Sequence, residues 1–137
     1  MPPITLVQRN DPNQAPQVMP LVPAAGDAIL TGGMGDCVCV IVIFNPNGAG
    51  AYTGMRGYHG GGGLPNVNFA ALFAFVPNNL TTRIIMISGP LQGSPYAQDY
   101  NRTMVRQRAA AAGLNNVMFH FRHGVGQGQV DRLGVIT

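Results

Sequence analysis

The chain is organised around one stretch, Thr31-Gly-Gly-Met-Gly-Asp-Cys37-Val-Cys-Val-Ile-Val-Ile-Phe44. A glycine-rich turn leads into Cys37, and the unbroken apolar or thiol run from 38 to 44 predicts a buried strand. The residues Asn45-Pro-Asn-Gly-Ala-Gly50 are typical of a turn, and 51–59 predicts the return strand. The sequence therefore predicts a hairpin centred on Asn47-Gly48.

This hairpin is expected to bring Cys37 and His59 to the same end. A turn at Asn47-Gly48 places position 37 opposite position 58 or 59. A cysteine beside a histidine is typical of a thiol nucleophile with its base. Thr31 opens the glycine turn, where its hydroxyl or carbonyl is a candidate to fix the histidine tautomer.

Glycines flank both candidate catalytic residues. They allow backbone N–H groups to converge on a developing anion, which makes the turn before Cys37 a candidate oxyanion site. The glycine run after His59 is expected to leave open room for a substrate. The turn residues are Gly33, Met34, Gly35 and Asp36, and the candidate pocket residues are Gly60, Gly61 and Gly62.

Simpler interpretations stay open. Cysteine is among the most buried residue types, so packing is our interpretation of Cys39 and an alternative for Cys37. His59 could likewise be structural, and His120 and His123 are weaker catalytic candidates. The glycine run could cradle a phosphate, although it lacks the spacing and the lysine of a P-loop.

Charge composition excludes several kinds of chemistry. All eight basic residues are arginine and all five acidic residues are aspartate, so neither a lysine Schiff base nor a glutamate acid or base is available. The net charge of +3 is modest and the arginines are mostly scattered, so we expect no nucleic-acid partner. Cys37 and Cys39 are poorly oriented to bridge each other, and no zinc-type spacing is present, so we expect no metal and no other cofactor.

The length of 137 residues fits one domain, and 46% hydrophobic residues allow a real core. No apolar run approaches the roughly 20 residues of a membrane span, so we expect no membrane partner. The N-terminus lacks the pattern of a Sec-type signal. We therefore expect a cytoplasmic protein, or one delivered into a host cell without a Sec-type signal peptide.

The order of predicted elements favours an α+β fold. Residues 1–25 contain six of the eleven prolines and are expected to form an extended lead-in with one edge strand near 4–8, followed by a single domain over 26–137. Further strands are expected at 27–31, 83–88, 116–122 and 132–136. Helices are expected at 66–76, after an asparagine cap, and at about 95–112, between Ser94 and Gly113.

These motifs resemble the group of protein glutamine deamidases that includes CheD and the cytotoxic necrotizing factors. Those proteins carry a small-residue pair before the cysteine, a threonine six residues before it, and a histidine on the neighbouring strand. The matching positions are Cys37, Thr31 and His59. The resemblance covers about residues 27–65, less than a third of the chain.

The resemblance implies a compact layered domain with a β-sandwich-like core of mostly antiparallel strands flanked by two helices. It implies a bacterial hydrolase that deamidates glutamine side chains of a protein substrate, through a thioester on Cys37 and with His59 as base. The context would be chemotaxis-like regulation or a toxin-like effector. No cofactor is implied, and the oligomeric state is not indicated.

One residue departs from the pattern. Asp36 stands where the related proteins have a small residue, and its charge disfavours a thiolate unless it points away or pairs with an arginine. An alternating strand would point it away. The alternatives are a catalytically inactive binding or structural protein of the same fold, and a thiol amidase that acts on small substrates.

Overall fold

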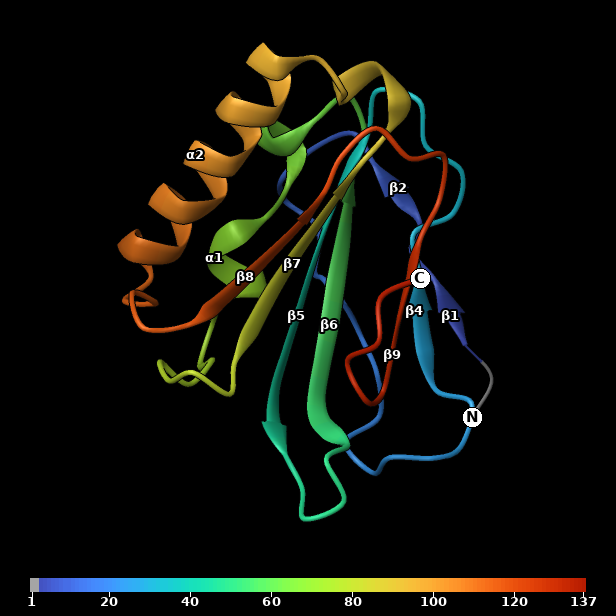
Figure 1. The fold of residues 1–137 in the computed structure, drawn as a ribbon, viewed down its shortest axis with the longest axis vertical. Coiled ribbons are helices and arrows are strands. Elements are labelled where there is room, and N and C mark those ends of the chain that lie inside the picture. The colour runs from blue at the N-terminus through green and yellow to red at the C-terminus, as the bar shows by residue number, and fades with distance from the viewer. Residues whose placement is uncertain (1–2) are drawn as a thin grey trace.

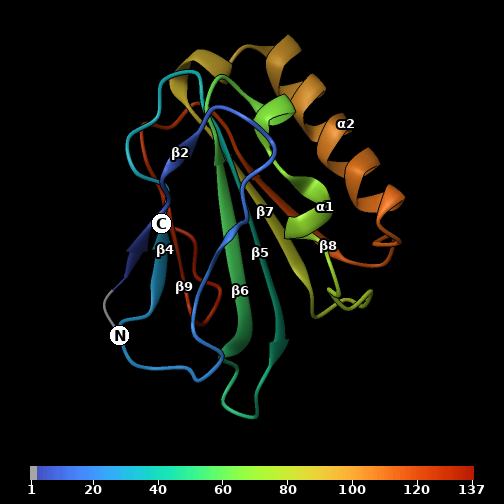
Figure 2. The same cartoon turned by 180° about the vertical axis from the view of Figure 1, so that it is seen from behind.

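A computed structural model describes residues 3–137, which form three layers (Figures 1 and 2). Two helices cover one face of a six-stranded sheet, and a three-stranded sheet lies over its other face. The small sheet has the order β1 (Ile4–Thr5), β4 (Ala28–Leu30), β9 (Gln129–Asp131). The expected α+β layered fold with two flanking helices is confirmed.

The large sheet is built around one central hairpin. Its order is β2 (Gln8–Arg9), β6 (Tyr52–Gly60), β5 (Val38–Pro46), β7 (Arg83–Ser88) and β8 (Met118–Arg122), and β3 (Gln17–Val18) also pairs with β6. The pairing is mixed, because β5 runs antiparallel to both its neighbours whereas β2 and β8 pair in parallel. The strands expected at 27–31, 83–88 and 116–122 correspond to β4, β7 and β8.

Strand β5 is buried on both faces, which explains its unbroken apolar sequence. Side chains alternate across a strand, so Val38, Val40 and Val42 pack toward the helices. The side chains of Cys39, Ile41 and Ile43 pack toward the small sheet, in the same apolar cluster as Cys37. The candidate nucleophile therefore lies on the face between the two sheets.

The register of the hairpin differs from the expected one. His59 lies opposite Cys39, and Val38 lies opposite Gly60, so position 37 is level with position 61 rather than with 58 or 59. The reason is a longer turn. The Asn47 side chain accepts hydrogen bonds from the N–H groups of Ala49 and Ala51, at 2.9 and 3.0 Å, which centres the loop on Ala49. Cys39 lies opposite His59 and Cys37 packs in the same cluster as Cys39, so Cys37 and His59 still face the same side.

The long helix α2 (Pro95–Ala111) forms as expected from local signals. The Ser94 hydroxyl accepts a hydrogen bond from the Ala97 N–H, and Gly113 adopts the left-handed conformation (φ +80°) that ends the helix. Two 3₁₀ turns, η1 (Leu64–Asn66) and η2 (Pro90–Gln92), flank the loops near the hairpin end.

Helix α1 (Phe69–Leu72) is much shorter than the helix expected over 66–76. Asn68, not Asn66, is its N-cap. The guanidinium of Arg56 donates to the carbonyls of Ala71, Leu72 and Ala74 at 2.9–3.2 Å, which satisfies the end of this single turn. A side chain from β6 therefore ends a helix that its own sequence would continue.

The segment expected to be an extended lead-in is part of the packed domain. Residues 3–25 contribute β1, β2 and β3, and the side chains of Leu6 and Met19 are 3% and 1% exposed. At the other end, no strand forms over 132–136. Strand β9 precedes that segment, and Ile136 makes only an isolated bridge to Val130.

Within the described residues, neither helix is both long and apolar enough to cross a membrane.

Candidate active site

His59 is the last residue but one of β6, and one of its ring nitrogens is fixed by a hydrogen bond. Its Nδ1 lies 2.7 Å from the Thr31 carbonyl oxygen. A carbonyl can only accept, so Nδ1 carries the proton and Nε2 carries the lone pair in the neutral ring. Burial lowers the pKa of His59, and the contact with the Thr31 carbonyl opposes only part of that effect. The histidine is therefore neutral at pH 7.

The free nitrogen of this ring is a buried base. His59 is 2% exposed, and among residues 3–137 its Nε2 has no hydrogen-bond partner. Buried polar atoms are almost always satisfied in folded proteins. His120 and His123 also have an unpartnered Nε2 within the described residues, but only His59 lies opposite Cys39, on the sheet face that carries the Cys37 cluster, where a free Nε2 suits general-base chemistry.

The Cys37 thiol is directed to Asp36 in this structure. Its Sγ lies 3.8 Å from Asp36 Oδ1, so the expected contact between the thiol and the imidazole is not made. The expectation that Asp36 points away is also wrong. Cys37 precedes β5 rather than lying in it, so strict strand alternation does not apply at position 36. Cys37 is 4% exposed, whereas Asp36 is exposed.

Cys39 faces the same cluster but is the poorer nucleophile. It is fully buried, and burial together with the neighbouring Cys37 raises its pKa. Its Sγ lies 4.0 Å from the Thr31 carbonyl. Packing, as interpreted from the sequence, accounts for this residue.

The Thr31 carbonyl orients His59, whereas the Thr31 hydroxyl bonds to neighbouring main-chain groups. The hydroxyl donates to the Gly32 carbonyl at 2.8 Å and accepts from the Gly128 N–H at 2.9 Å. The Thr31 N–H also donates to the Gly128 carbonyl. The side chain therefore fastens the 124–128 loop to the end of β4, and the main chain orients the imidazole.

The turn before Cys37 alternates between exposed and buried residues. Gly33, Gly35 and Asp36 are exposed, whereas Met34 is buried in the cluster with Cys37. The Met34 N–H donates to the Gly126 carbonyl at 2.8 Å, and Val125 packs against the same cluster. The turn and the 124–128 loop together close over the thiol.

The open room expected beside His59 is filled. A Cβ at Gly60 would lie 2.6 Å from the Gly63 carbonyl, and one at Gly61 would collide with the Asn10 side chain. Gly62 is exposed and has a positive φ of +79°. The glycines at 60–62 are thus explained by close backbone packing and a tight turn, and not by a cavity.

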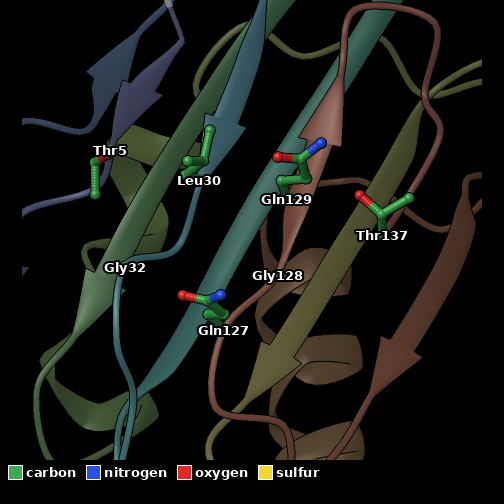
Figure 3. Close-up of a pocket in the computed structure, with 7 residues that line it drawn as sticks. All are labelled: Thr5, Leu30, Gly32, Gln127, Gly128, Gln129 and Thr137. Carbon is green, nitrogen blue, oxygen red and sulfur yellow. The ribbon is translucent and has the colours of Figure 1, made fainter.

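A pocket of about 450 Å³ lies on the small sheet, close to the Thr31 end of the site (Figure 3). Gly32 and Gly128 form one end of it, and the side chain of Gln127 lies between them. Neither Cys37 nor His59 lines this pocket. Its lining residues are Thr5, Leu30, Gly32, Gln127, Gly128, Gln129 and Thr137.

Of the other two histidines, His120 lies in β8 and His123 directly follows that strand. Nδ1 of His123 is 3.3 Å from the Ser88 hydroxyl, and its ring stacks on Phe121 on the helix side. His120 lines a separate pocket with Arg122 and Ile136. Burial lowers the pKa of both histidines, and neighbouring Arg83 and Arg102 lower those of His120 and His123 respectively. In the part of the chain that the structure describes, no group of three or more His, Cys, Asp or Glu is placed to hold a metal ion.

Comparison of the chain with protein-family models, curated proteins and solved structures finds no match. The site therefore has to be interpreted from its own geometry.

Two parts of the site were missed from the sequence. One is the 124–128 loop, whose glycines at 124, 126 and 128 were a usable signal of close backbone approach. The other is Gln92, which reaches the Cys37 turn from beyond β7. A lone glutamine after a proline carries no local signal of such a contact.

Proposed function

We propose that the chain is a cysteine-dependent protein glutamine deamidase, with Cys37 as nucleophile and His59 as base. One observation carries the proposal. The Thr31 carbonyl fixes a neutral His59, whose Nε2 is buried and unpartnered among the described residues, on the sheet face that carries the Cys37 thiol. The resemblance of Thr31, Cys37 and His59 to the deamidase motif supports the choice of substrate class.

The reaction begins with transfer of the thiol proton to Nε2 of His59. The Cys37 sulfur then bonds to the carboxamide carbon of the substrate glutamine, and the carbonyl electrons move to its oxygen. N–H groups of the turn from Gly33 to Cys37 stabilise that oxyanion. Collapse of the intermediate breaks the C–N bond, and the imidazolium donates its proton to the departing ammonia.

The second half-reaction restores the enzyme. His59 takes a proton from water as the oxygen attacks the thioester carbon, and the thiolate leaves and recovers that proton. The products are a glutamate side chain and free Cys37. Nothing in this sequence of steps requires a metal or an organic cofactor.

Two local movements precede the attack. The Cys37 side chain rotates from Asp36 toward His59, and the turn at Met34 separates from the 124–128 loop to admit the glutamine. The contacts to be broken are one backbone hydrogen bond, from Met34 to Gly126, and the packing of Val125. Loops that close over a site commonly move in this way when substrate binds.

The substrate is proposed to be a glutamine-bearing protein in the cytoplasm of the producing bacterium or of a host cell. The test is incubation of the purified protein with bacterial and host-cell extracts, followed by peptide mass spectrometry for conversion of glutamine to glutamate. Wild type and Cys39→Ala are expected to produce the same modified peptides, and Cys37→Ser none. Modification of substrate by Cys37→Ser but not by Cys39→Ala would show that Cys39, and not Cys37, is the nucleophile.

A second candidate function is favoured by the closed geometry. A thiol that is 4% exposed and directed to Asp36 is what a non-catalytic binding or structural protein of the same fold would have. Iodoacetamide labelling at neutral pH distinguishes the two, because a packed thiol reacts slowly and an activated one rapidly. Conversion of free glutamine, with no change in proteins, would indicate instead an amidase for small substrates.

A further inference from the structure

Three consecutive carbonyls of the Cys37 turn are held by one short segment. The Gly35 carbonyl accepts from the Leu91 N–H, and the Cys37 carbonyl accepts from the Gly89 N–H, both at 2.9 Å. The Asp36 carbonyl between them accepts from the Gln92 side chain, whose Nε2 lies 2.8 Å away. Residues 89–92 thus hold the backbone on both sides of the nucleophile.

The middle contact needs a side chain because the main chain of 89–92 has no donor left for it. The N–H groups of Gly89 and Leu91 are used by the Cys37 and Gly35 carbonyls, Pro90 has no N–H, and the Gln92 N–H donates to the Gly89 carbonyl. The long Gln92 side chain reaches round the turn instead. Gly89 permits the close approach, because a Cβ there would collide with the Gly35 carbonyl.

Gln92 is itself fixed by the long helix. The Asn101 side chain donates from Nδ2 to Gln92 Oε1 at 3.2 Å, and Asn101 is 1% exposed on the buried side of α2. This bond sets which end of the Gln92 amide faces Asp36. The Gln92 Nε2 also lies 3.5 Å from where a Cβ of Gly63 would be, so the amide stands between the Cys37 turn and the glycine run after His59.

We infer that Gln92 is a positioning residue for the nucleophile. The Asp36–Cys37 peptide unit is planar, so fixing the Asp36 carbonyl also fixes the direction of the Cys37 N–H and the position of its Cα. Those two features decide where the thiol meets His59 and where one oxyanion donor points. This inference rests on the proposed deamidase function and adds a residue that the catalytic motif does not contain.

The test uses a matched pair of glutamines. Gln92→Glu keeps the length and the Oε1 acceptor for Asn101 but replaces the donor to Asp36 with a carboxylate oxygen. Gln98→Glu is the control, because Gln98 is also partly buried and its Nε2 donates to the Gly93 carbonyl at 2.8 Å. Gln92→Ala and Gln98→Ala repeat the comparison without the added charge.

Four quantities are measured on the full-length protein: thermal unfolding, the rate of Cys37 alkylation by iodoacetamide between pH 6 and 9, kcat and KM. We expect both Gln92 variants to lower kcat about 10- to 100-fold, with KM changed less than about threefold, as misplacement of a reacting group does. The alkylation profile of Cys37 is expected to change with them. The Gln98 variants are expected to match wild type in kcat and alkylation at a similar loss of stability.

Two results would overturn the inference in different ways. If wild type is active and the Gln92 variants match the Gln98 variants in kcat and alkylation, Gln92 is only structural and the proposed function stands. If wild-type Cys37 reacts no faster than a free thiol and no glutamine is converted, the proposed function fails and this inference fails with it.

Discussion

At the scale of single residues, the site depends on which nitrogen of His59 is free. A backbone carbonyl, and not a carboxylate, holds the ring, so the histidine gains orientation without a neighbouring negative charge. Burial then favours the neutral form, which is the form that accepts a proton. Orientation and protonation state are thus set by separate features of the fold.

The lowered pKa of His59 predicts a loss of stability in acid. The unfolded chain binds a proton near pH 6.5, whereas folded His59 does so only at lower pH. The contribution of neutral His59 to the free energy of unfolding is therefore complete above about pH 6.5, and it is lost as pH falls from there toward the folded-state pKa. Urea unfolding at about pH 7.5 and about pH 5.5 is expected to show a larger acid loss for wild type than for His59→Gln.

His120 and His123 provide the comparison for that experiment. Both have lowered pKa values but are more exposed than His59, so His120→Gln and His123→Gln are expected to reduce the acid loss less. NMR titration measures the pKa of the His59 imidazole directly. A pKa at or above the ordinary histidine value would contradict a neutral buried base.

Asp36 is predicted to restrain the nucleophile. Its carboxylate accepts a hydrogen bond from the thiol and so directs the sulfur toward Asp36, and an amide oxygen is a weaker acceptor, so Asp36→Asn is expected to speed alkylation of Cys37 at pH 7 about 3- to 10-fold. Asp99→Asn is the matched control, because Asp99 is an exposed carboxylate on α2. An unchanged or slower rate in Asp36→Asn alone would mean that the Asp36 contact does not restrain the thiol.

At the scale of elements, local signals predicted some parts of the fold well. Helix α2 has its cap, its first proline and its terminal glycine within its own sequence, and it forms as expected. Helix α1 does not, because Arg56 on another strand ends it. The predicted β5–β6 register was wrong for a similar reason, because contacts of the Asn47 side chain set the length of the turn.

The candidate site follows the same division. Period-two alternation was enough to place Cys37 and His59 on one face, despite the wrong register. The contacts of Gln92, Gly126 and Gly128 join elements far apart in the chain, and no local pattern encodes them. In the proline-rich segment, the edge strand expected near 4–8 corresponds to β1 and the first residue of β2, whereas β3 was not predicted.

Thr31→Val separates the two roles of Thr31 at the end of β4. The variant keeps the carbonyl that orients His59 but removes the hydroxyl that accepts from the Gly128 N–H. We expect a loss of about 1 kcal/mol in the free energy of unfolding, because a partly buried donor loses its acceptor. Turnover is expected to fall less than about tenfold, since the imidazole stays oriented.

His59→Gln is the contrast for that prediction, with full loss of turnover expected and measured in the same assay. If Thr31→Val abolishes turnover while the protein stays folded, the hydroxyl or the 124–128 loop takes part in the reaction more directly than its contacts indicate.

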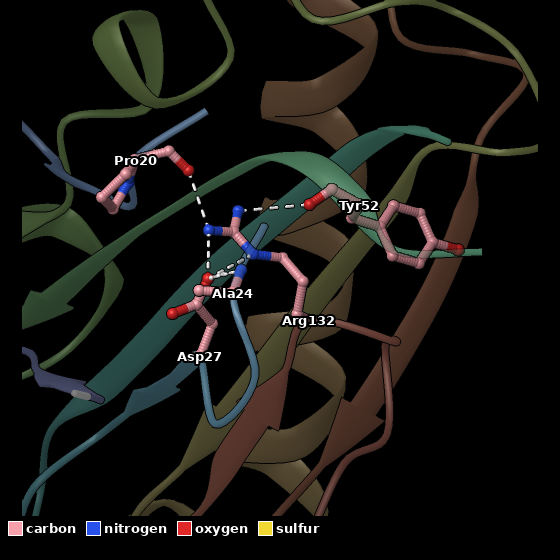
Figure 4. Close-up of polar contacts among 5 residues, drawn as sticks. All are labelled: Pro20, Ala24, Asp27, Tyr52 and Arg132. Atoms are coloured by element: carbon pink, nitrogen blue, oxygen red, sulfur yellow. Dashed lines mark hydrogen bonds and ion pairs between the residues drawn. The ribbon is translucent and has the colours of Figure 1, made fainter. Parts of the chain in front are cut away.

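At the scale of the whole molecule, one buried ion pair ties the N-terminal segment to the domain (Figure 4). Arg132 is 4% exposed and Asp27 is 2% exposed. The Arg132 guanidinium donates to Asp27 Oδ2, to the Tyr52 carbonyl and to the Pro20 carbonyl. It therefore joins the loop before β4 to strand β6 and to the proline-rich residues that precede the loop.

The charges of this pair follow from its surroundings. Burial opposes ionisation of Asp27, but the Ala24 N–H and the Arg132 guanidinium outweigh it and hold the pKa of the carboxyl below its usual value. The carboxylate contributes stability above the unfolded-state pKa of about 3.9, and the contribution is lost as pH falls through the folded-state value. The Asp27–Arg132 ion pair is thus intact throughout the neutral pH range.

Arg132→Met is predicted to destabilise the fold and to release the N-terminal segment. The variant keeps an apolar side chain but removes the opposite charge from beside the buried Asp27 carboxylate, which costs about 3–5 kcal/mol. The double variant Asp27→Asn/Arg132→Met is expected to lose less than Arg132→Met alone, because no buried charge remains. Arg122→Met is the control, since Arg122 is half-buried and makes one long hydrogen bond, to the Ile136 carbonyl.

Limited proteolysis, compared with urea unfolding, shows which part of the chain is released. Cleavage within 10–25 should accelerate in Arg132→Met before the rest of the domain is cut. Uniform cleavage of the domain, or equal losses of unfolding free energy in Arg132→Met and Arg122→Met, would show that the N-terminal strands stay bound to β6 without the Asp27–Arg132 ion pair.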